Sequence, residues 1–309
     1  MTFNLIKHFT KVVFPILLGI CPVALFAAEF ALPTPGNALI GQIQYAKVEY
    51  GDTTTRVASR FNVGLNALVA ANPGTSERML GSKSVVVPTA FILPNLPRDG
   101  MVINLPEMRL YYYVPGSNEV MTFPIGIGKI GNTIPIRNSI VSRKTLNPTW
   151  TPGPDVRKYN EAQGIDLPRV MPPGPDNPLG PYAIYLSIPS FLIHSTIFPE
   201  SVGRRASFGC IRMHEEDIKD LYPIVNQGTK VLVVNMPNKV GWHGNKLYME
   251  AHPPLEEHNA GTDTNLGDMV ATIQNVLPRN VTTMVDWQLV AHLAAEPDGI
   301  PHEIGVRLN

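Results

Sequence analysis

This sequence has few cysteines and a formal net charge of zero. Its 309 residues include only 2 cysteines, and its 25 lysine and arginine residues are matched by 25 aspartate and glutamate residues. Nucleic-acid-binding proteins usually carry a basic excess that attracts phosphates. The balanced charge therefore argues against a nucleic-acid partner, and the function has to be sought in individual motifs.

The rest of the composition indicates a folded chain that is rich in loops. Hydrophobic residues make up 44% of the sequence, which is enough for a core and excludes a wholly disordered chain. The 30 prolines and 25 glycines are too many for an all-helical protein, because both residues interrupt helices. An α+β or β protein is expected, and the length allows two domains of about 150 residues each.

The N-terminus has the pattern of a secretory signal. Two lysines precede an uncharged, mostly apolar run over residues 12–26, and small residues follow up to Ala28. The alternative is a membrane anchor, but a span needs about 20 apolar residues, and Pro15 and Pro22 interrupt this run. We expect residues 1–28 to be removed, which leaves a mature protein that is not integral to a membrane.

Proline and glycine divide the remaining chain into segments. A leader of residues 29–43 precedes a compact segment of residues 44–89, and a proline-punctuated joint of residues 88–97 leads to a β-rich stretch of residues 98–236. Residues 237–309 form a C-terminal extension with helical patterning. The joint predicts that the segments on either side of it fold as separate compact units.

The compact segment of residues 44–89 has the order strand, helix, helix, strand, and it resembles the LysM module closely. Thr54 departs from the family, which usually has an apolar residue there. The resemblance implies binding of N-acetylglucosamine-containing glycans, here peptidoglycan. The residues that carry it are Tyr45, Val48, Gly51-Asp52-Thr53, Val57-Ala58, Phe61, Val63, Leu68 and Asn72-Pro73.

Strand-forming runs separated by turn residues fill the β-rich stretch and predict a mainly antiparallel β domain. These runs cover residues 102–104, 109–114, 122–127, 183–187 and 230–234. In the extension, apolar residues at helical spacing predict one helix over Met269, Ile273 and Val276 and a shorter one over Trp287, Val290 and Leu293.

Two motifs of the β-rich stretch carry chemistry, Ile193-His194-Ser195-Thr196 and Ser207-Phe208-Gly209-Cys210-Ile211-Arg212-Met213. A thiol is a strong nucleophile as the thiolate, which a neighbouring imidazole can generate. The glycine before Cys210 permits a tight turn and frees amide groups that can face an oxyanion, and Arg212 can pair with a carboxylate. The pattern indicates Cys/His acyl transfer. The spacing alone is also compatible with a cysteine buried in the core and a histidine whose hydrogen-bond partners lie elsewhere.

The two motifs resemble the L,D-transpeptidase catalytic domain, often called the YkuD domain. The resemblance implies that Cys210 is the nucleophile, that His194 is the general base and acid, and that Ser195 orients the imidazole through its backbone carbonyl. Other segments similar to that family are Met108-Arg109-Leu110-Tyr111-Tyr112, Pro124-Ile125-Gly126-Ile127-Gly128 and Glu250-Ala251-His252-Pro253-Pro254-Leu255-Glu256.

The same resemblance assigns the other residues of the second motif. Ser207 and Gly209 shape the turn of the nucleophile, and Arg212 matches a substrate-contact position. Phe208 departs from the family, because many members have a second histidine there. With Ser207 and Arg212, it is grouped among the expected substrate-binding residues. The chemistry implied needs no metal and no cofactor.

The expected fold class is α+β, with a small βααβ LysM module, a mainly antiparallel, β-sandwich-like YkuD catalytic domain and a partly helical C-terminal extension. The expected function is that of a periplasmic L,D-transpeptidase that acts on peptidoglycan stem tetrapeptides. It would release D-alanine and transfer the acyl group to an amine, either the lysine of an anchored outer-membrane protein or a second stem. An L,D-carboxypeptidase on the same scaffold and a non-catalytic wall-binding protein remain as alternatives.

Other catalytic classes lack their motifs. The sequence has no Ser-x-x-Lys, and Arg205 stands where a hydrolase elbow at Ser207 would need glycine. A zinc motif beginning at His214 would need histidine at Ile218. Glu215-Glu216-Asp217 is expected to be the solvated start of a helix. Trp150, Tyr182 and Tyr185 fit either a binding groove or ordinary core packing.

Overall fold

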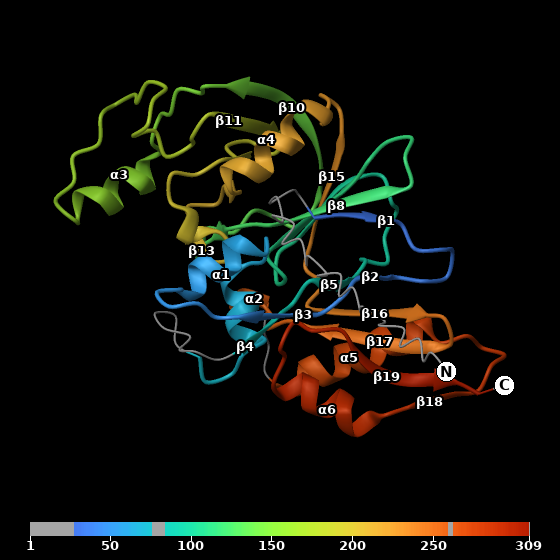
Figure 1. Ribbon diagram of the computed structural model, residues 1–309. Helices are drawn as coiled ribbons and strands as arrows, with labels where there is room; N and C mark the ends of the chain where they lie inside the picture. Colours follow the sequence, from blue (N-terminus) through green and yellow to red (C-terminus); the bar gives the residue numbers. More distant parts are fainter. Residues whose placement is uncertain (1–27, 76–83, 259–261, 309) are drawn as a thin grey trace, which may run out of the picture.

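The computed structural model describes residues 28–75, 84–258 and 262–308 (Figure 1). The expected signal lies outside the described residues except for Ala28, which begins β1 (Ala28–Ala31). Within the described ranges, no helix has the length and apolar character needed to cross a membrane.

Residues 44–89 fold in the predicted order of strand, helix, helix and strand. β3 (Gln44–Lys47) pairs antiparallel with β4 (Ser84–Val87), and α1 (Thr54–Arg60) and α2 (Leu65–Ala70) share one small core with them. Thr53 caps α1, because its Oγ1 accepts a hydrogen bond of 3.2 Å from the Arg56 N–H. We refer to these residues as the N-terminal module.

Asn72 explains why the module closes where the sequence has Asn72-Pro73. Its Nδ2 donates to the carbonyl oxygens of Leu68 at 2.8 Å and Val86 at 2.7 Å, and its Oδ1 accepts from the Val86 N–H at 2.8 Å. One side chain therefore joins the end of α2 to β4.

The β-rich stretch is built on a nine-stranded sheet, and all five predicted runs are strands of it. Pairing is parallel between β6 and β15 and between β12 and β14, and antiparallel between the other neighbours, which agrees with the mainly antiparallel prediction. The order is β1, β8 (Glu119–Pro124), β7 (Arg109–Tyr113), β6 (Gly100–Asn104), β15 (Lys230–Val234), β10 (Asn138–Leu146), β11 (Tyr182–Leu186), β12 (Leu192–His194) and β14 (Ile211–Arg212).

The sheet bends around its own core. Apolar residues of β6, β7 and β8 and of β11, β12 and β14 belong to one buried cluster, together with Ile218 and Leu221 of α4 (Glu215–Ile224). A register shift between Val141 and Arg143 of β10 lies between these two halves, where a bulge increases local curvature. Figure 1 shows α4 beside β10 and β11, with α3 (Pro154–Glu161) on an excursion beyond them.

The C-terminal extension contains both predicted helices, α5 (Thr262–Val276) and α6 (Trp287–Ala295), but it is not only helical. The helices share a core with an antiparallel four-stranded sheet that sequence analysis missed. Its order is β16 (Asn238–His243), β17 (Lys246–Ala251), β19 (His302–Arg307) and β18 (Thr283–Val285). The short helix η2 (Glu256–His258) follows β17.

The leader and the proline-punctuated joint are structured, and the joint is not a free linker. β2 (Leu39–Gly41) from the leader pairs with β5 (Ala90–Ile92) from the joint, and β1 is the edge strand of the nine-stranded sheet. The Ala38 N–H donates to the Trp242 carbonyl at 2.9 Å, so the leader is also attached to β16. The N-terminal module nevertheless has an apolar core of its own, distinct from the main core of the nine-stranded sheet.

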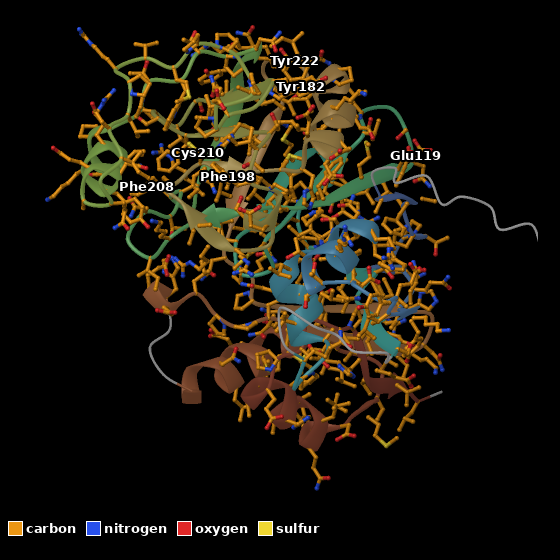
Figure 2. The ribbon with its side chains drawn as sticks, turned by 60° about the vertical axis from the view of Figure 1, so that its left-hand side comes forward. Glu119, Tyr182, Phe198, Phe208, Cys210 and Tyr222 are labelled. Atoms are coloured by element: carbon orange, nitrogen blue, oxygen red, sulfur yellow. The ribbon has the colours of Figure 1, made fainter. Side chains whose placement is uncertain are left out.

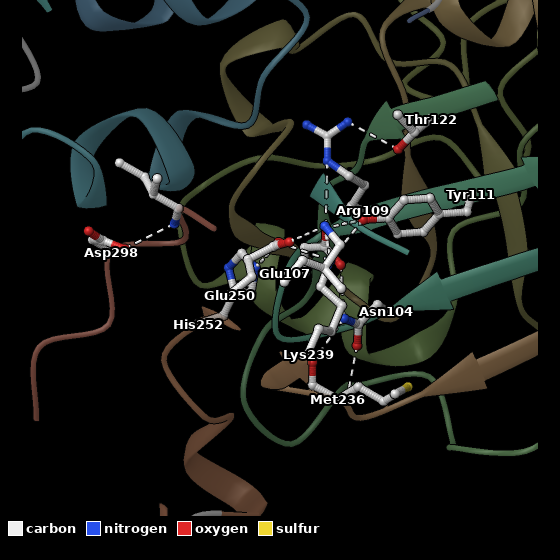
Figure 3. A network of polar contacts seen from close by, with 12 residues as sticks. Asn104, Glu107, Arg109, Tyr111, Thr122, Met236, Lys239, Glu250, His252 and Asp298 are labelled. Atoms are coloured by element: carbon white, nitrogen blue, oxygen red, sulfur yellow. Dashed lines mark hydrogen bonds and ion pairs between the residues drawn. The ribbon is translucent and has the colours of Figure 1, made fainter. Parts of the chain in front are cut away.

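A buried ion cluster joins the extension to the nine-stranded sheet (Figure 3). The Lys239 ammonium lies 2.8 Å from Glu107 Oε1 and 2.9 Å from Glu250 Oε1, and it donates to the Tyr111 hydroxyl at 2.9 Å. These side chains are all buried. Burial by itself would raise the pKa of Glu107, but the Lys239 charge and other nearby cations hold it at about 2.

The cluster also reaches the joint and the end of β17. Glu250 Oε2 accepts a hydrogen bond of 2.6 Å from the Ile92 N–H of β5, and His252 Nε2 lies 2.7 Å from Glu250 Oε1. A single buried charge group therefore connects the sheet, the joint and the extension.

Lys239→Met should lower the free energy of unfolding by about 3–5 kcal/mol, because two buried carboxylates would lose their cation. Denaturant unfolding followed by tryptophan fluorescence measures this loss. Lys246→Met is the matched control, since Lys246 pairs with Glu303 at 2.6 Å where both side chains are solvent-exposed. That control should leave stability almost unchanged. Equal losses in the two variants would contradict the role given to the cluster.

Candidate active site

The parallel pairing of β12 and β14 brings the two sequence motifs together. Ile193 is the partner of Ile211, and His194 is the partner of Arg212. Side chains alternate along a strand, so His194 and Arg212 lie on one face of the sheet. Cys210 precedes β14 directly, and continued alternation places it on that face as well. It packs with Leu192, two residues before His194.

His194 is held by backbone carbonyls. Its Nδ1 lies 2.5 Å from the Ser195 carbonyl oxygen. A carbonyl can only accept, so Nδ1 carries the proton and Nε2 keeps a free lone pair. Burial, and after it the positive charge of Arg212, lower the pKa of His194 to about 4. The imidazole is therefore neutral at neutral pH.

The hydroxyl of Ser195 is fully used in fixing the neighbouring loop. Its Oγ donates to the Leu179 carbonyl at 2.9 Å and accepts from the Tyr182 N–H at 3.1 Å. Gly180 makes the close approach possible, because a Cβ at that position would lie 2.4 Å from Ser195 Oγ. The Ser195 side chain is therefore not available to the imidazole, which contacts the Ser195 carbonyl instead.

The turn before the thiol is held by Ser207. Its Oγ accepts from the Gly209 N–H at 3.0 Å and donates to the Cys210 carbonyl at 2.6 Å. Gly209 has a φ of +117°, and a Cβ there would lie 2.7 Å from the Phe191 ring, so only glycine fits. The Gly209 N–H is thereby occupied by the Ser207 hydroxyl.

Cys210 is half-buried in mainly apolar surroundings. It packs in a cluster with Leu179 and Leu192, and Trp150 and Tyr185 border the same cluster. Burial raises the pKa of the thiol, against the opposing effects of the Leu192 N–H and the Arg212 charge. Thiol and imidazole are therefore both neutral in the resting protein.

Of the three aromatic residues left undecided by the sequence, Trp150 and Tyr185 pack against the same apolar cluster as Cys210. Tyr182 instead packs against Tyr222 at a ring-centroid distance of 5.4 Å and contacts the main core. Figure 2 shows this tyrosine pair apart from Cys210.

Arg212, two residues after Cys210, has a guanidinium hydrogen-bond donor that no described residue uses. Its Nε is buried and has no hydrogen-bond partner within the described ranges. Its main chain is fixed on both sides by Gly126, which accepts from the Arg212 N–H at 2.9 Å and donates to the Arg212 carbonyl at 2.8 Å. The guanidinium lies 5.9 Å from the centroid of the Phe198 ring.

Phe208 connects the nucleophile turn to the α3 excursion. Its ring lies 5.3 Å from the ring of Tyr159 in α3, and the Lys129 ammonium lies 4.3 Å from the Phe208 centroid and 3.8 Å from the Tyr159 centroid. Figure 2 shows Phe208 and Cys210 beside α3. Lys129 and Tyr159 were not among the residues expected from the sequence. Lys129 follows the motif that ends at Gly128, but nothing in the polar sequence of α3 singles out Tyr159.

A possible metal-ligand group lies away from the thiol, in the buried ion cluster. The side-chain atoms of Glu107, Glu250 and His252 lie within 4.8 Å of one another. The Lys239 ammonium already bonds to both carboxylates, so the protein's own cation neutralises this group.

Comparison with known proteins agrees with this geometry. The YkuD family, described as the L,D-transpeptidase catalytic domain, matches residues 98–233. The chain is 43% identical over 238 residues to the probable L,D-transpeptidase YcfS of Escherichia coli, covering 75% of this chain and 74% of that protein. It is 39% identical over 249 residues to the probable L,D-transpeptidase YbiS of the same species, covering 79% and 81%.

Among solved structures, the catalytic domain of the E. faecium L,D-transpeptidase is 23% identical, with a TM-score of 0.35, and the match covers 45% of this chain and 99% of that domain. The extent and identity of the two E. coli matches, together with the YkuD match, decide the family. The chain belongs to the L,D-transpeptidases with a YkuD catalytic domain.

Proposed function

We propose that this L,D-transpeptidase works through an acyl-enzyme on Cys210, with a peptidoglycan stem tetrapeptide as acyl donor. The observation that carries the proposal is the parallel pairing that puts His194, Cys210 and Arg212 on one face at the edge of the sheet. The thiol, the base and an under-used cation are the groups that acyl transfer requires.

In the first step, His194 Nε2 takes the thiol proton as the sulfur of Cys210 attacks the carbonyl carbon of the third stem residue, meso-diaminopimelate. The tetrahedral intermediate collapses, the peptide C–N bond breaks, and His194 returns the proton to the leaving D-alanine amine. A thioester remains on Cys210. An acceptor amine then attacks the thioester, His194 takes its proton, and the sulfur leaves and is reprotonated.

The resting charges fit a concerted proton transfer. With the pKa of Cys210 raised and that of His194 lowered to about 4, no thiolate–imidazolium pair forms in advance. Arg212 then supports the negative charge that develops on sulfur or holds a carboxylate of the donor. The Phe208 and Cys210 amides, rather than the Gly209 amide, are left to face the oxyanion.

The apolar surroundings of the thiol favour transfer over hydrolysis. Cys210 packs against the apolar cluster of Leu179, Ala183 and Leu192, as Trp150 and Tyr185 do, and such apolar surroundings limit the approach of water to a thioester. The layout of the chain favours the lysine of an anchored outer-membrane protein as acceptor, with a second stem, giving 3→3 cross-links, as the other candidate.

The N-terminal module supplies the second binding function in this proposal. Its element order and the LysM resemblance support binding of N-acetylglucosamine-containing glycan strands, which would raise the local concentration of stem peptides. Residues 1–28 would direct the enzyme to the periplasm, where peptidoglycan is found.

Cys210→Ala should abolish D-alanine release from a soluble tetrapeptide, because no nucleophile remains. Its unfolding midpoint and its binding to isolated sacculi should match wild type, since a methyl group differs little from a thiol in bulk. Chromatography of the products measures turnover, and sacculus pull-down measures binding. Turnover by the purified variant would refute the mechanism.

A carbapenem should acylate Cys210 and no other residue, because the mature chain has no second cysteine. His194→Ala should slow this acylation by roughly 10²–10⁴-fold, the usual cost of losing a general base. Intact-protein mass followed against time tests both statements. An adduct on the Cys210→Ala protein, or an unchanged rate in His194→Ala, would contradict the assigned roles.

The acid limb of kcat/KM should lie near pH 4 and not near the pKa of an ordinary histidine. His194 must be neutral to act as base, and with its pKa at about 4 it stays neutral as the pH falls from 7 to 5. Rates of D-alanine release between pH 4 and pH 7 test this. A tenfold fall between pH 7 and pH 5 would show that the imidazole is protonated there.

A further inference from the structure

The N-terminal module touches the catalytic domain through main-chain atoms at the corner between α1 and α2. A Cβ on Gly203 would lie 2.3 Å from the Leu65 nitrogen and 2.5 Å from Gly64 Cα, so the two chains are in contact. Gly203 has a φ of +75°, which also favours glycine. The Asn66 N–H donates to the Gly203 carbonyl at 3.2 Å.

Gly203 lies in the segment that joins His194 to Cys210. Its N–H donates to the Ile125 carbonyl at 3.1 Å, and the next residue, Gly126, forms both main-chain hydrogen bonds with Arg212. Beyond Gly203, β13 (Arg205–Ser207) pairs in parallel with β9 (Ile127–Gly128) and ends at the serine that holds the nucleophile turn. Three successive main-chain contacts, Asn66 with Gly203, Gly203 with Ile125, and Gly126 with Arg212, thus link the module to Arg212.

A second contact lies on the other side of the nucleophile, where Asn62 of the module meets Asp217 of α4. Asn62 Nδ2 donates to Asp217 Oδ1 at 2.9 Å, and both side chains are buried, at 8% and 5% exposure. Asn62 Oδ1 and Asp217 Oδ2 have no hydrogen-bond partner in the described part of the chain. The sequence-based expectation that Asp217 is solvated at the start of a helix was therefore wrong, because its side chain is buried.

Asn62 Oδ1 and Asp217 Oδ2 can form a hydrogen bond with each other if Asp217 carries a proton. A carboxylic acid and a carboxamide can form a pair of hydrogen bonds, in which the acid O–H donates to the amide oxygen and the amide N–H donates to the acid carbonyl. A carboxylate offers only the second of these, and it leaves two acceptors buried without donors.

The charges around Asp217 agree with a bound proton. Burial raises the pKa of Asp217 to about 7, against the hydrogen bond from Asn62 and the charge of Arg109 on β7. The neighbouring carboxylates of Glu216 and Asp220 act in the same direction as burial.

We infer that the corner of residues 62–66 is a positioning element of the active site, which holds the segments on both sides of Cys210 through the Gly64–Gly203 contact and a protonated Asn62–Asp217 pair. The inference rests on the proposed role of Cys210 as nucleophile. Gly203 lies before Cys210 and Asp217 after it, so a shift of the corner moves the turn and Arg212 together. Misplacement of reacting groups by about 1 Å can lower a rate by about 10²-fold.

The first test displaces the corner with a side chain. In Gly64→Ala the Cβ would lie 3.2 Å from Gly203 Cα, and in Gly64→Leu the larger side chain must push the two segments apart. We expect kcat for a soluble tetrapeptide to fall in that order, to roughly a tenth or less in Gly64→Leu, while sacculus binding persists. Gly267→Leu is the control, because Gly267 lies in α5 with no atom within 4 Å of its Cβ position.

The second test removes the proton and keeps the pair. Asp217→Asn retains two hydrogen bonds with Asn62 at every pH. In wild type the pKa of Asp217 is raised from its ordinary 3.8 to about 7, so its contribution to stability is complete below about pH 4 and is lost as the pH rises to about 7. The ratio of kcat in wild type to kcat in Asp217→Asn should be constant below pH 6 and fall above pH 7.

The outcomes separate this inference from the proposed function. A wild-type kcat in folded Gly64→Leu would overturn it, and so would a ratio that stays constant from pH 5 to pH 8.5. A stability difference between wild type and Asp217→Asn with no change in the kcat ratio would make the pair a structural contact only, which also overturns the positioning role. Turnover by Cys210→Ala would instead refute the nucleophile itself.

Discussion

The parallel pairing of β12 with β14 is the constraint on which the catalytic site depends. Parallel neighbours cannot be joined by a tight turn, and their connection needs a dozen or more residues. The chain between His194 and Cys210 is that connection, so the gap between the two motifs follows from topology. Within it lie η1 (Pro199–Ser201) and β13, and both are supported from outside the sheet. The two motifs that contain His194 and Cys210 lie side by side because two very short strands are aligned by one register.

β14 is an edge strand with a neighbouring strand of the sheet on one side only, so the position of the site depends on further contacts from outside the sheet. Part of this support comes from Gly126, whose main chain brackets Arg212, and part from the small pairing of β9 with β13. The glycines in this region serve close approach: Gly128 leaves 3.1 Å between its Cβ position and Gly209 Cα, and Gly203 admits the module. Side chains at these positions would separate the layers, so the glycine-containing motif that resembles the family is a packing requirement of the catalytic turn.

Local patterning was sufficient for strands formed by short strand-forming runs between turn residues, for helices with one apolar face, and for the two motifs. The five apolar runs, the βααβ order of the module and both C-terminal helices were all predictable for this reason. β10 was not, because exposed and half-buried polar residues alternate there with only two fully buried positions. Asp217 was expected to be solvated and Lys239 was not singled out, for a related reason. A charged residue is expected at the surface, and only a partner distant in sequence makes its burial possible.

The attachments between the segments of the chain could not be predicted from the sequence for the same physical reason. Proline density and composition mark where the chain turns, but they do not report which surfaces become buried together. Lys239 of the extension has its partners in the nine-stranded sheet and in β17, and Glu250 of β17 accepts from β5 in the joint. Removing any one of these segments would leave a buried charge without its counter-charge, which costs more than the pair contributes. The extension is therefore held to the catalytic sheet by electrostatics that no single segment satisfies, and the module is held to it by main-chain contact at Gly203. Sheet, joint and extension meet at the buried ion cluster, and the module meets the sheet domain at Gly203, so the folding unit is larger than the motif that identifies the family.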